Sequence, residues 1–536
     1  MKKHYRRLLI LLVVLSAGVL IYSLYDDQIS PPAPTDELRL FGRAPQIHPD
    51  YSGTVIPANI APLNFLIQED GSQYYVKIYS QQGPQIEVNS RSPRILIPRS
   101  LWRELLELNR GKELYFDVFV KSADFGSSLK NAEMSWRRFD SVVNKIARED
   151  IDGFLVYRRI EPVHSSWRKM GIYQRNLQRF DESLVLDNGY YEGGCLNCHT
   201  FCSNHTDKML IGIRSSEYGS SALLVENGRV SKIGTKFGYT SWHPSGRLAA
   251  YSVNRIGQFF HTAQNEVRDV VDLDSLLAYY LVGAGKVKTT PALAQKDRLE
   301  TYPSWSPDGR YLYFCSAPKR WTENTIPDCY NEIKYDLVRI SYDLESDKWG
   351  ELETVLSAQD TGLSIVLPRI SPDGRWLLFC MCEYGCFPVY QSSSDLYIMD
   401  LRGAQESGQY KYRRLNINSD QSESWHSWSS NSRWIAFSSK RGSGPFTRSY
   451  IAYVDLEGTV HKPLVVPQKD PMYYDSCLWT YSVPELVIEP VKVTKEKLGR
   501  VVRGSREIPV DFPITMATPK GDALPTHDEP WMQLRE

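Results

Sequence analysis

A short segment recurs four times in the second half of the chain and constrains the fold more than any other feature. The copies lie at residues 239–252, 302–316, 367–380 and 427–439. The second copy begins Tyr-Pro-Ser-Trp-Ser-Pro-Asp-Gly-Arg and continues into an apolar run. The copies are about 60 residues apart, which lies within the range of propeller repeats once loops are inserted. The sequence therefore predicts a repeat protein.

The composition of each copy indicates what the repeat unit is. In Ser-Pro-Asp-Gly at residues 306–309, Pro fixes φ and Gly permits a positive φ, so these residues favour a tight hairpin turn. The apolar run after Arg310 predicts a strand buried on both faces, and later segments such as 395–401 and 450–456 predict a further strand. One such sheet cannot bury its faces alone, whereas a ring of sheets can. We therefore predict a mainly β chain that contains a β-propeller.

These copies closely resemble the TolB-type propeller repeat with its Trp-Ser-Pro-Asp-Gly-Arg core. The resemblance covers roughly residues 200–490. Segments 209–214 and 222–228 supply strands of a further blade, and 477–484 resembles a degenerate copy without Asp-Gly. Together with the four copies, these segments predict five or six blades, and the resemblance to the family implies six. The propeller is assigned to residues 206–490, and the polar, Pro-containing tail at 491–536 is expected to be loosely ordered.

The N-terminus predicts export. Four basic residues among the first seven precede an uncharged apolar run from Leu8 to Tyr25. A run of about 18 residues can just span a bilayer, and the basic side stays in the cytoplasm. We predict an uncleaved signal anchor at 1–27 and a Pro-rich linker at 28–43, which places the body in the periplasm, attached to the inner membrane. A cleaved signal peptide is the alternative, although no small-x-small cleavage site follows the run.

Residues 44–165 show strand-like alternation. Segments 63–67, 74–78 and 113–120 each fit a strand bounded by Gly, Asp or Pro, and 100–108 fits a short helix. A small β-sandwich-like domain is the simplest account. It carries no cluster of catalytic residue types and fits a structural or docking module.

The bridge at residues 166–205 carries the one chemically distinctive motif, Cys195-Leu196-Asn197-Cys198-His199. This pattern is typical of c-type haem attachment. Two thiols three positions apart can each add to a haem vinyl group, and His199 follows directly to bind the iron. Export favours this interpretation, and the sequence predicts covalent haem c.

A second axial ligand is then expected. Met170, Met209, His205 and His164 are the candidates, and Met ligation would suit electron transfer. Met170 stands in an Arg-rich and aromatic segment that could cover a haem and pair with its propionates. For each Met, a packing role is favoured over ligation.

Two other interpretations of the cysteine cluster remain open. Cys195 and Cys198 could form a disulfide, which persists outside the cytoplasm. Alternatively, Cys195, Cys198, Cys202 and His205 offer a tetrahedral zinc set, although the two pairs leave little loop to wrap a metal.

The remaining cysteines are expected to have structural roles. Cys315 and Cys380 occupy one repeat position on a buried strand, so both are expected to be small core residues. Cys382 and Cys386 are the expected loop disulfide.

His426 precedes an inner strand, near the expected mouth of the axial channel. Thr240, Pro303 and Pro368 occupy the equivalent positions, so no ring of histidines is predicted. Neither a Gly-x-Ser-x-Gly elbow nor any other hydrolase or transferase site is recognised. The 63 basic and 63 acidic side chains balance, which argues against nucleic-acid binding.

Taken together, the anchor, Cys-x-x-Cys-His-x-Phe-Cys and the repeats resemble exported TolB-like proteins of Bacteroidetes-type bacteria. The expected function is a periplasmic c-type haem protein that transfers electrons to, or senses redox state for, an unidentified envelope protein docked on the propeller. The alternative is a non-enzymatic envelope scaffold in which the cysteines form a disulfide or zinc staple.

Overall fold

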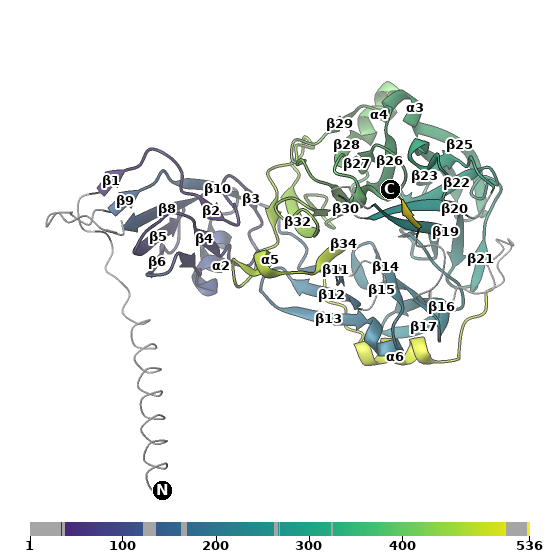
Figure 1. Ribbon diagram of the computed structural model, residues 1–536, viewed down its shortest axis with the longest axis horizontal. Coiled ribbons are helices and arrows are strands. Elements are labelled where there is room, and N and C mark those ends of the chain that lie inside the picture. The colour runs from purple at the N-terminus through teal and green to yellow at the C-terminus, as the bar shows by residue number, and fades with distance from the viewer. Residues whose placement is uncertain are drawn as a thin grey trace, which may run out of the picture. The chain divides into compact units, whose positions relative to one another are not determined.

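The computed structural model describes residues 38–121, 136–161, 169–261, 268–322, 325–510 and 533–535, together with Pro34 and Glu266. The chain divides into two compact units (Figure 1). The first is drawn from residues 1–53, 62–146 and 468–472, and the second from 54–61, 147–467 and 473–536.

The first unit contains a mixed sheet, a second small sheet and one helix. In the mixed sheet, β8 pairs with β5 on one side and with β9 and β10 on the other, while β1 runs parallel to β9. The strands of this sheet that belong to the first unit are β1 (Leu38–Leu40), β5 (Gln73–Tyr79), β6 (Ile86–Ser90), β8 (Glu113–Lys121), β9 (Trp136–Arg138) and β10 (Val142–Ile146). The small sheet contains β2 (Ile47–His48), β4 (Phe65–Ile67) and β7 (Arg94–Ile95).

Helix α2 (Arg99–Leu108) forms where the sequence predicts it. Its buried residues are Trp102, Leu105 and Leu106, which lie three and four positions apart and therefore on one face. This face contributes to the core of the first unit.

The second unit contains six antiparallel sheets, each with four strands in the order of a propeller blade (Figure 1). The first sheet contains β34 (Thr480–Val487), β11 (Phe154–Ile160), β12 (Met170–Asn176) and β13 (Glu182–Asp187). The next two contain β14 (Cys195–Cys202), β15 (His205–Ser215), β16 (Gly219–Glu226) and β17 (Arg229–Ile233), then β18 (Thr240–Trp242), β19 (Leu248–His261), β20 (Arg268–Leu281) and β21 (Lys286–Lys288). The fourth contains β22 (Arg298–Trp305), β23 (Tyr311–Pro318), β24 (Asp336–Asp343) and β25 (Lys348–Leu356). The last two contain β26 (Ser364–Ile370), β27 (Trp376–Cys382), β28 (Asp395–Asp400) and β29 (Tyr412–Arg414), then β30 (Glu423–Trp428), β31 (Trp434–Ser439), β32 (Arg448–Tyr453) and β33 (Leu464–Val465).

Short elements complete the described chain. They are β3 (Val55–Ile56), η1 (Asn188–Tyr191), η2 (Tyr330–Glu332), α3 (Ala358–Thr361), η3 (Pro388–Tyr390), α4 (Leu401–Ser407), α5 (Tyr473–Ser476), α6 (Lys495–Arg503) and β35 (Gln533–Arg535). Strand β35 adds to the edge of β19.

The repeated Ser-Pro-Asp-Gly segment forms the predicted turn between the first and second strands of a sheet. Gly309 and Gly374 have φ values of 73° and 72° at the ends of two such turns. The Asp308 carboxylate accepts hydrogen bonds from the Ser306 hydroxyl at 2.6 Å and from the Arg310 N–H at 3.1 Å. The strand that follows is buried throughout the next apolar residues, Leu312 and Phe314 among them, as its sequence predicts.

The first blade-like sheet joins distant parts of the chain. Its innermost strand, β34, comes from near the C-terminus and pairs with β11, with Leu155 opposite Leu486. The expected boundaries therefore differ from the structure. The sandwich was expected to extend to residue 165 and a bridge to follow at 166–205, but β11 to β14 are strands of blade-like sheets. The alternation of apolar and polar residues is weak in these strands because they contain many Arg residues. Such cations can pack over aromatic rings, and the Arg159 guanidinium lies 4.6 Å from the Tyr173 ring centroid.

The segment after residue 490 also differs from expectation, because residues 495–503 form α6. Thr494 caps this helix, and its hydroxyl accepts the Lys497 N–H at 3.3 Å. Leu498 and Val502, four positions apart, are fully buried. The helix is therefore part of the fold and not of a loose tail.

Three predictions concern residues outside the described parts of the chain. They are the anchor at 1–27, positions 28–33 and 35–37 of the linker, and His164. Within the described parts of the chain, no helix has the length and apolar character needed to cross a membrane.

Candidate functional site

A recurring irregularity shapes the axis of the ring. Five of the six inner strands contain one extra residue relative to the strand beside them, in β14, β22, β26, β30 and β34. Such β-bulges re-aim side chains and leave one residue outside the ladder. Tyr302, Leu367, Trp425 and Val483 occupy the bulges with φ between 44° and 57°.

In each of these inner strands, the residue that follows the bulge residue lies at the axis of the ring. Pro303, Pro368 and Pro484 are three of these axial residues. Pro has no N–H and is tolerated because a bulge residue donates no ladder hydrogen bond. Thr240 occupies the equivalent place in the sheet of β18.

His199 and His426 occupy the two remaining positions. Cys198-His199-Thr200-Phe201 in β14 therefore corresponds to Trp425-His426-Ser427-Trp428 in β30. The cysteine motif is the inner strand of a blade, a relationship that the sequence analysis missed. In four of the six inner strands, His, Pro or Thr is followed by Ser or Thr and then by an aromatic residue, and this pattern was the available signal. The stronger Cys-x-x-Cys-His pattern drew the interpretation away from it.

These axial residues enclose a small chamber with a volume of about 40 Å³. Its lining consists of His199, Tyr239, Thr240, Tyr302, Pro303, Leu367, Pro368, Arg369, Trp425, His426, Val483 and Pro484. We call this cavity the axial chamber.

The two axial histidines differ in their hydrogen bonds. His426 is 3% exposed, and its Nε2 lies 3.1 Å from the Leu378 carbonyl oxygen while its Nδ1 lies 3.7 Å from the Cys380 Sγ. His199 is equally buried, but neither of its ring nitrogens has a hydrogen-bond partner in the described structure. The chamber thus contains one imidazole that the fold itself does not satisfy.

Burial lowers the pKa of His199 to about 3, and the positive charges of Arg158 and Arg369 act in the same direction. The carbonyl groups of Val156 and Val483 approach the ring and oppose this shift, without hydrogen-bond geometry at either nitrogen. Burial, followed by Arg369, likewise lowers the pKa of His426 to about 3. Both rings are therefore neutral at physiological pH.

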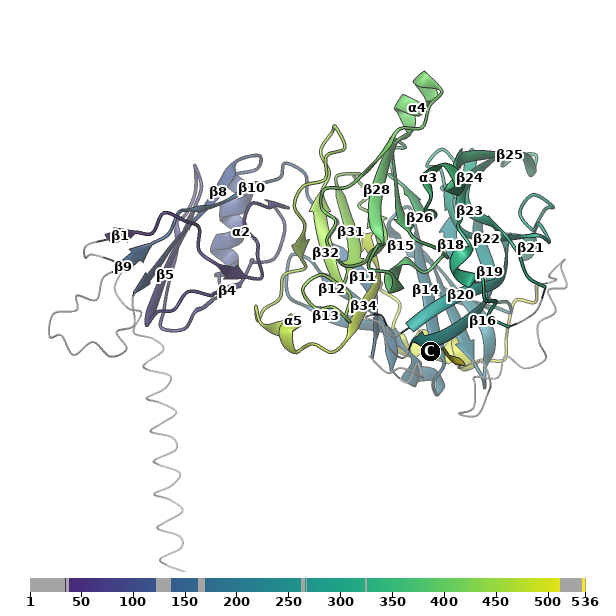
Figure 2. The same cartoon turned by 45° about the horizontal axis from the view of Figure 1, so that its top comes forward.

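A larger cavity of about 270 Å³ lies against the hairpin formed by the long strands β19 and β20. Figure 1 shows this hairpin reaching from its own sheet toward the centre of the ring, and Figure 2 shows the same two strands after the view is turned. Tyr239 and Trp425 line both cavities. We call this larger space the hairpin cavity.

Charged and aromatic side chains make up half of the residues that line the hairpin cavity. Its cations are Arg158, Arg214, Arg268 and Lys440, its carboxylates are Glu161 and Glu266, and its aromatic residues are Tyr239, Phe387, Tyr390, Trp425 and Phe446. Lys440 pairs with Glu266, and the Arg268 guanidinium lies 5.9 Å from the Tyr390 ring centroid. The Arg214 Nη2 donates to the Cys195 Sγ at 3.1 Å.

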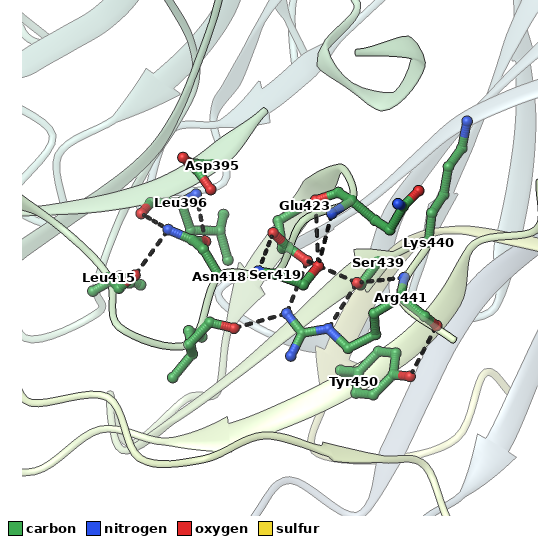
Figure 3. Close-up of polar contacts among 12 residues, drawn as sticks. Asp395, Leu396, Leu415, Asn418, Ser419, Glu423, Ser439, Lys440, Arg441 and Tyr450 are labelled. Atoms are coloured by element: carbon green, nitrogen blue, oxygen red, sulfur yellow. Dashed lines mark hydrogen bonds and ion pairs between the residues drawn. The ribbon is translucent and has the colours of Figure 1, made fainter. Parts of the chain in front are cut away.

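A buried network fixes the strand end that presents Lys440 (Figure 3). The Glu423 carboxylate is fully buried and accepts hydrogen bonds from Arg441 and Ser439 at 2.8 Å and from the Ser419 hydroxyl at 2.6 Å. Arg441 is therefore directed toward the Glu423 carboxylate, and in Figure 3 the Lys440 side chain extends away from this network.

The folded motif does not fit a covalently attached haem. Cys195 lines the hairpin cavity, whereas His199 lines the axial chamber, whose volume of about 40 Å³ is far below what a porphyrin requires. A porphyrin cannot reach the His199 ring nitrogens in that space. Cys195 and His199 also face different cavities, so the two side chains do not converge on one ligand.

The two methionines expected as candidate distal ligands are packing residues in this structure. The Met170 Sδ accepts the Leu196 N–H at 3.0 Å, and Met209 is 1% exposed within the same apolar core. His205 is exposed at the far end of the β14–β15 hairpin.

We expect protein produced together with the haem c maturation system to carry no covalent haem. The reason is that haem attached at Cys195 and Cys198 would prevent β14 from entering the ring. The measurement is a pyridine haemochrome spectrum of the purified, folded protein. A matched control carries an extra Cys-x-x-Cys-His pentapeptide fused after residue 536, which should attach haem in the same cells. A stoichiometric haem signal that Cys198→Ser removes would contradict this expectation.

The alternative zinc set does not converge either. Cys195 and Cys202 stand at opposite ends of β14, and seven extended residues span roughly 20 Å. Tetrahedral zinc requires all sulfur ligands within about 2.3 Å of the ion. His205 instead lies near Asp207 and Glu489, and their ligand atoms fall within 4.8 Å of one another at the surface.

The other cysteines are free thiols in the described structure. Cys315 and Cys380 are fully buried in one apolar core, as predicted. The expected Cys382–Cys386 disulfide is not formed, and both thiols are buried in that core.

Comparison with known proteins gives distant structural similarity only. No family model and no curated protein matches the sequence. Luciferin-regenerating enzyme matches at 9% identity and a TM-score of 0.33, covering 60% of this chain and 88% of that one. Oligogalacturonate lyase from Vibrio parahaemolyticus matches at 11% identity and a TM-score of 0.30, covering 57% and 92%.

Puromycin hydrolase matches at 15% identity and a TM-score of 0.33, covering 57% of this chain and 45% of that one, so the match spans less than half of that protein. At these TM-scores the similarities add nothing to the description of the site. The assignment of a propeller-like fold therefore depends on the six four-stranded sheets and their order.

Proposed function

We propose that this chain is an exported, membrane-anchored TolB-like propeller of six blades that binds a small anionic ligand in the hairpin cavity. It acts as a binding module and not as an enzyme. The observation that carries the proposal is the lining of the hairpin cavity, where four cations face two carboxylates among five aromatic rings.

The chemistry of the lining supports this ligand class. Cationic side chains in a cavity form charge-assisted hydrogen bonds with carboxylate or phosphate oxygens. Aromatic rings supply apolar area and a flat surface for a planar group. A cavity of about 270 Å³ lies just below the range of about 300–1,000 Å³ that is usual for pockets of drug-sized ligands, so it suits a smaller molecule. An aromatic carboxylate satisfies all three conditions.

Export and anchoring are supported by the basic residues and the apolar run of the first 25 positions. The six sheets and the four Ser-Pro-Asp-Gly-like repeats support the TolB-like assignment. An envelope protein docked on the propeller face remains the proposed partner, with ligand occupancy as the signal that it detects.

Titration calorimetry tests the ligand class, with benzoate and benzamide as probes of equal shape. We expect benzoate to bind at least tenfold more tightly, because one charge-assisted hydrogen bond contributes about 1.5–3 kcal/mol and 1.4 kcal/mol is tenfold. Arg214→Gln and Lys440→Gln should each weaken benzoate binding about 10- to 100-fold. Arg310→Gln removes a cation from an exposed turn and serves as the matched control. Equal affinity for the two probes, or no binding of either, would refute the proposal.

A further inference from the structure

We propose that the axial chamber is a binding site for one small monovalent anion, of the size of chloride or formate, held between His199 and Arg369. This site is separate from the hairpin cavity and does not depend on the proposed function.

The first observation is the unsatisfied ring of His199. A buried polar group without a hydrogen bond costs about 1–3 kcal/mol, so native structures satisfy such groups with protein, water or an ion. His199 is 3% exposed, both ring nitrogens lack a partner among the described residues, and the ring faces the chamber. Because the ring is neutral, one nitrogen carries an N–H that can donate to a ligand in the chamber.

The second observation is the sign of the surrounding charge. Arg158 and Arg369 are the charged side chains with the largest effect on the pKa of His199, and both are cations. Arg369 also lines the chamber and depresses the pKa of His426. Its Nη2 donates to the Glu485 Oε1 at 2.7 Å, and burial raises the pKa of that carboxyl group while Arg369 opposes the rise. The guanidinium has five N–H donors, so the pair with Glu485 leaves donors for a second acceptor.

The walls and the volume select the kind of anion. Pro303, Pro368 and Pro484 present ring carbons and no N–H, so the chamber has little capacity to solvate an ion except through His199, Arg369 and Thr240. A volume of about 40 Å³ limits the occupant to a small species and suits an ion such as chloride or formate. In such a low-dielectric space, attraction between an anion and a guanidinium is stronger than in water.

A metal cation fits the same residues poorly. Tetrahedral zinc sites take three or four protein ligands, but both nitrogens of His426 already face the Leu378 carbonyl and the Cys380 sulfur. This leaves His199 as a single available imidazole, beside a guanidinium that repels cations.

Bromide, an anomalous scatterer close to chloride in size, tests the site directly. Crystals of the full chain grown in gluconate and soaked in bromide should show an anomalous peak between the His199 ring and the Arg369 guanidinium. In solution, thermal denaturation at constant ionic strength should show a midpoint about 2–4 °C higher in chloride or formate than in gluconate, because an ion that binds only the folded state stabilises it.

The variant His199→Phe keeps a ring of similar shape and removes both nitrogens, so it should abolish the anomalous peak and the chloride-dependent shift. The matched control is His205→Phe, which changes an exposed histidine and should retain both. Circular dichroism and the melting midpoint in gluconate confirm that each variant folds. Arg369→Gln provides a second variant, and its response to chloride should be lost even where its basal stability falls.

A chamber that holds only water would give no anomalous peak and equal melting in the three salts, and either result overturns the proposal. Retention of the chloride shift by His199→Phe also overturns it. A response to formate but not to chloride supports the proposal and assigns the site to a carboxylate group, whereas a response to both assigns it to free monovalent anions.

Discussion

A chain that ends at residue 479 is expected to lose cooperative folding of the second unit. The truncation removes β34, the inner strand that joins β11 and completes the ring. It also removes Tyr481, Leu486 and Val487, each 1% exposed or less. Burying one large apolar side chain contributes about 1.5–3 kcal/mol, and three such losses together with an unpaired β11 edge approach the total stability of about 5–15 kcal/mol.

Urea denaturation followed by near-ultraviolet circular dichroism measures this effect. A chain that ends at residue 510 keeps β34 and α6 and should unfold with the midpoint of the full chain. A chain that ends at residue 492 keeps β34 but lacks α6, with its buried Leu498 and Val502, and should have an intermediate midpoint. If the chain ending at 479 unfolds with the midpoint and slope of the full chain, β34 does not close the ring.

The second large effect is expected from Arg441→Ala. This change leaves the Glu423 carboxylate, which is fully buried, without the cation that donates to it at 2.8 Å (Figure 3). Removing one partner of a buried ion pair costs about 3–5 kcal/mol because the remaining charge is uncompensated. The guanidinium also lies 5.0 Å from the Tyr450 ring centroid, so packing is lost as well.

The free energy of unfolding from denaturant titration gives the magnitude. Arg414→Ala is the matched control, since the Arg414 Nη2 donates to Asp395 at 2.8 Å but 51% of its side chain is exposed. Surface pairs of this kind contribute about 0–1 kcal/mol. Equal losses in the two variants would show that burial of Glu423 is not what makes the Arg441 pair important.

Sequence reasoning predicted the parts of the fold that depend on local chemistry. The Ser-Pro-Asp-Gly turns and the apolar strands after them follow from backbone preferences within a few residues, and the structure has both. The closure by β34 could not be predicted in the same way, because Leu155 and Leu486 meet across more than 300 positions. Pairing at that distance leaves no periodic signal in either strand alone.

For the cysteine motif, a local pattern was present but led to the wrong place in the fold. A five-residue pattern with strong chemical associations dominated the interpretation of β14, while the weaker repeat pattern around His199 explains its place in the fold. The structure assigns His199 by register, since the bulge falls between Asn197 and Thr200 as it falls between Ser424 and Ser427 in β30. The spacing and the residue types within Cys-x-x-Cys-His do not reveal the strand register or the position of the bulge.

The bulges have a consequence for how such a ring can change during evolution or by design. Each bulge presents one side chain to the centre from a position that makes no ladder hydrogen bond, so a single substitution alters the axis without disturbing the sheet. Histidine in place of Pro303 and Pro368 would join His199 and His426 and convert a lining of prolines into four converging imidazoles. The scaffold and the chemistry of its centre can therefore vary independently, one blade at a time.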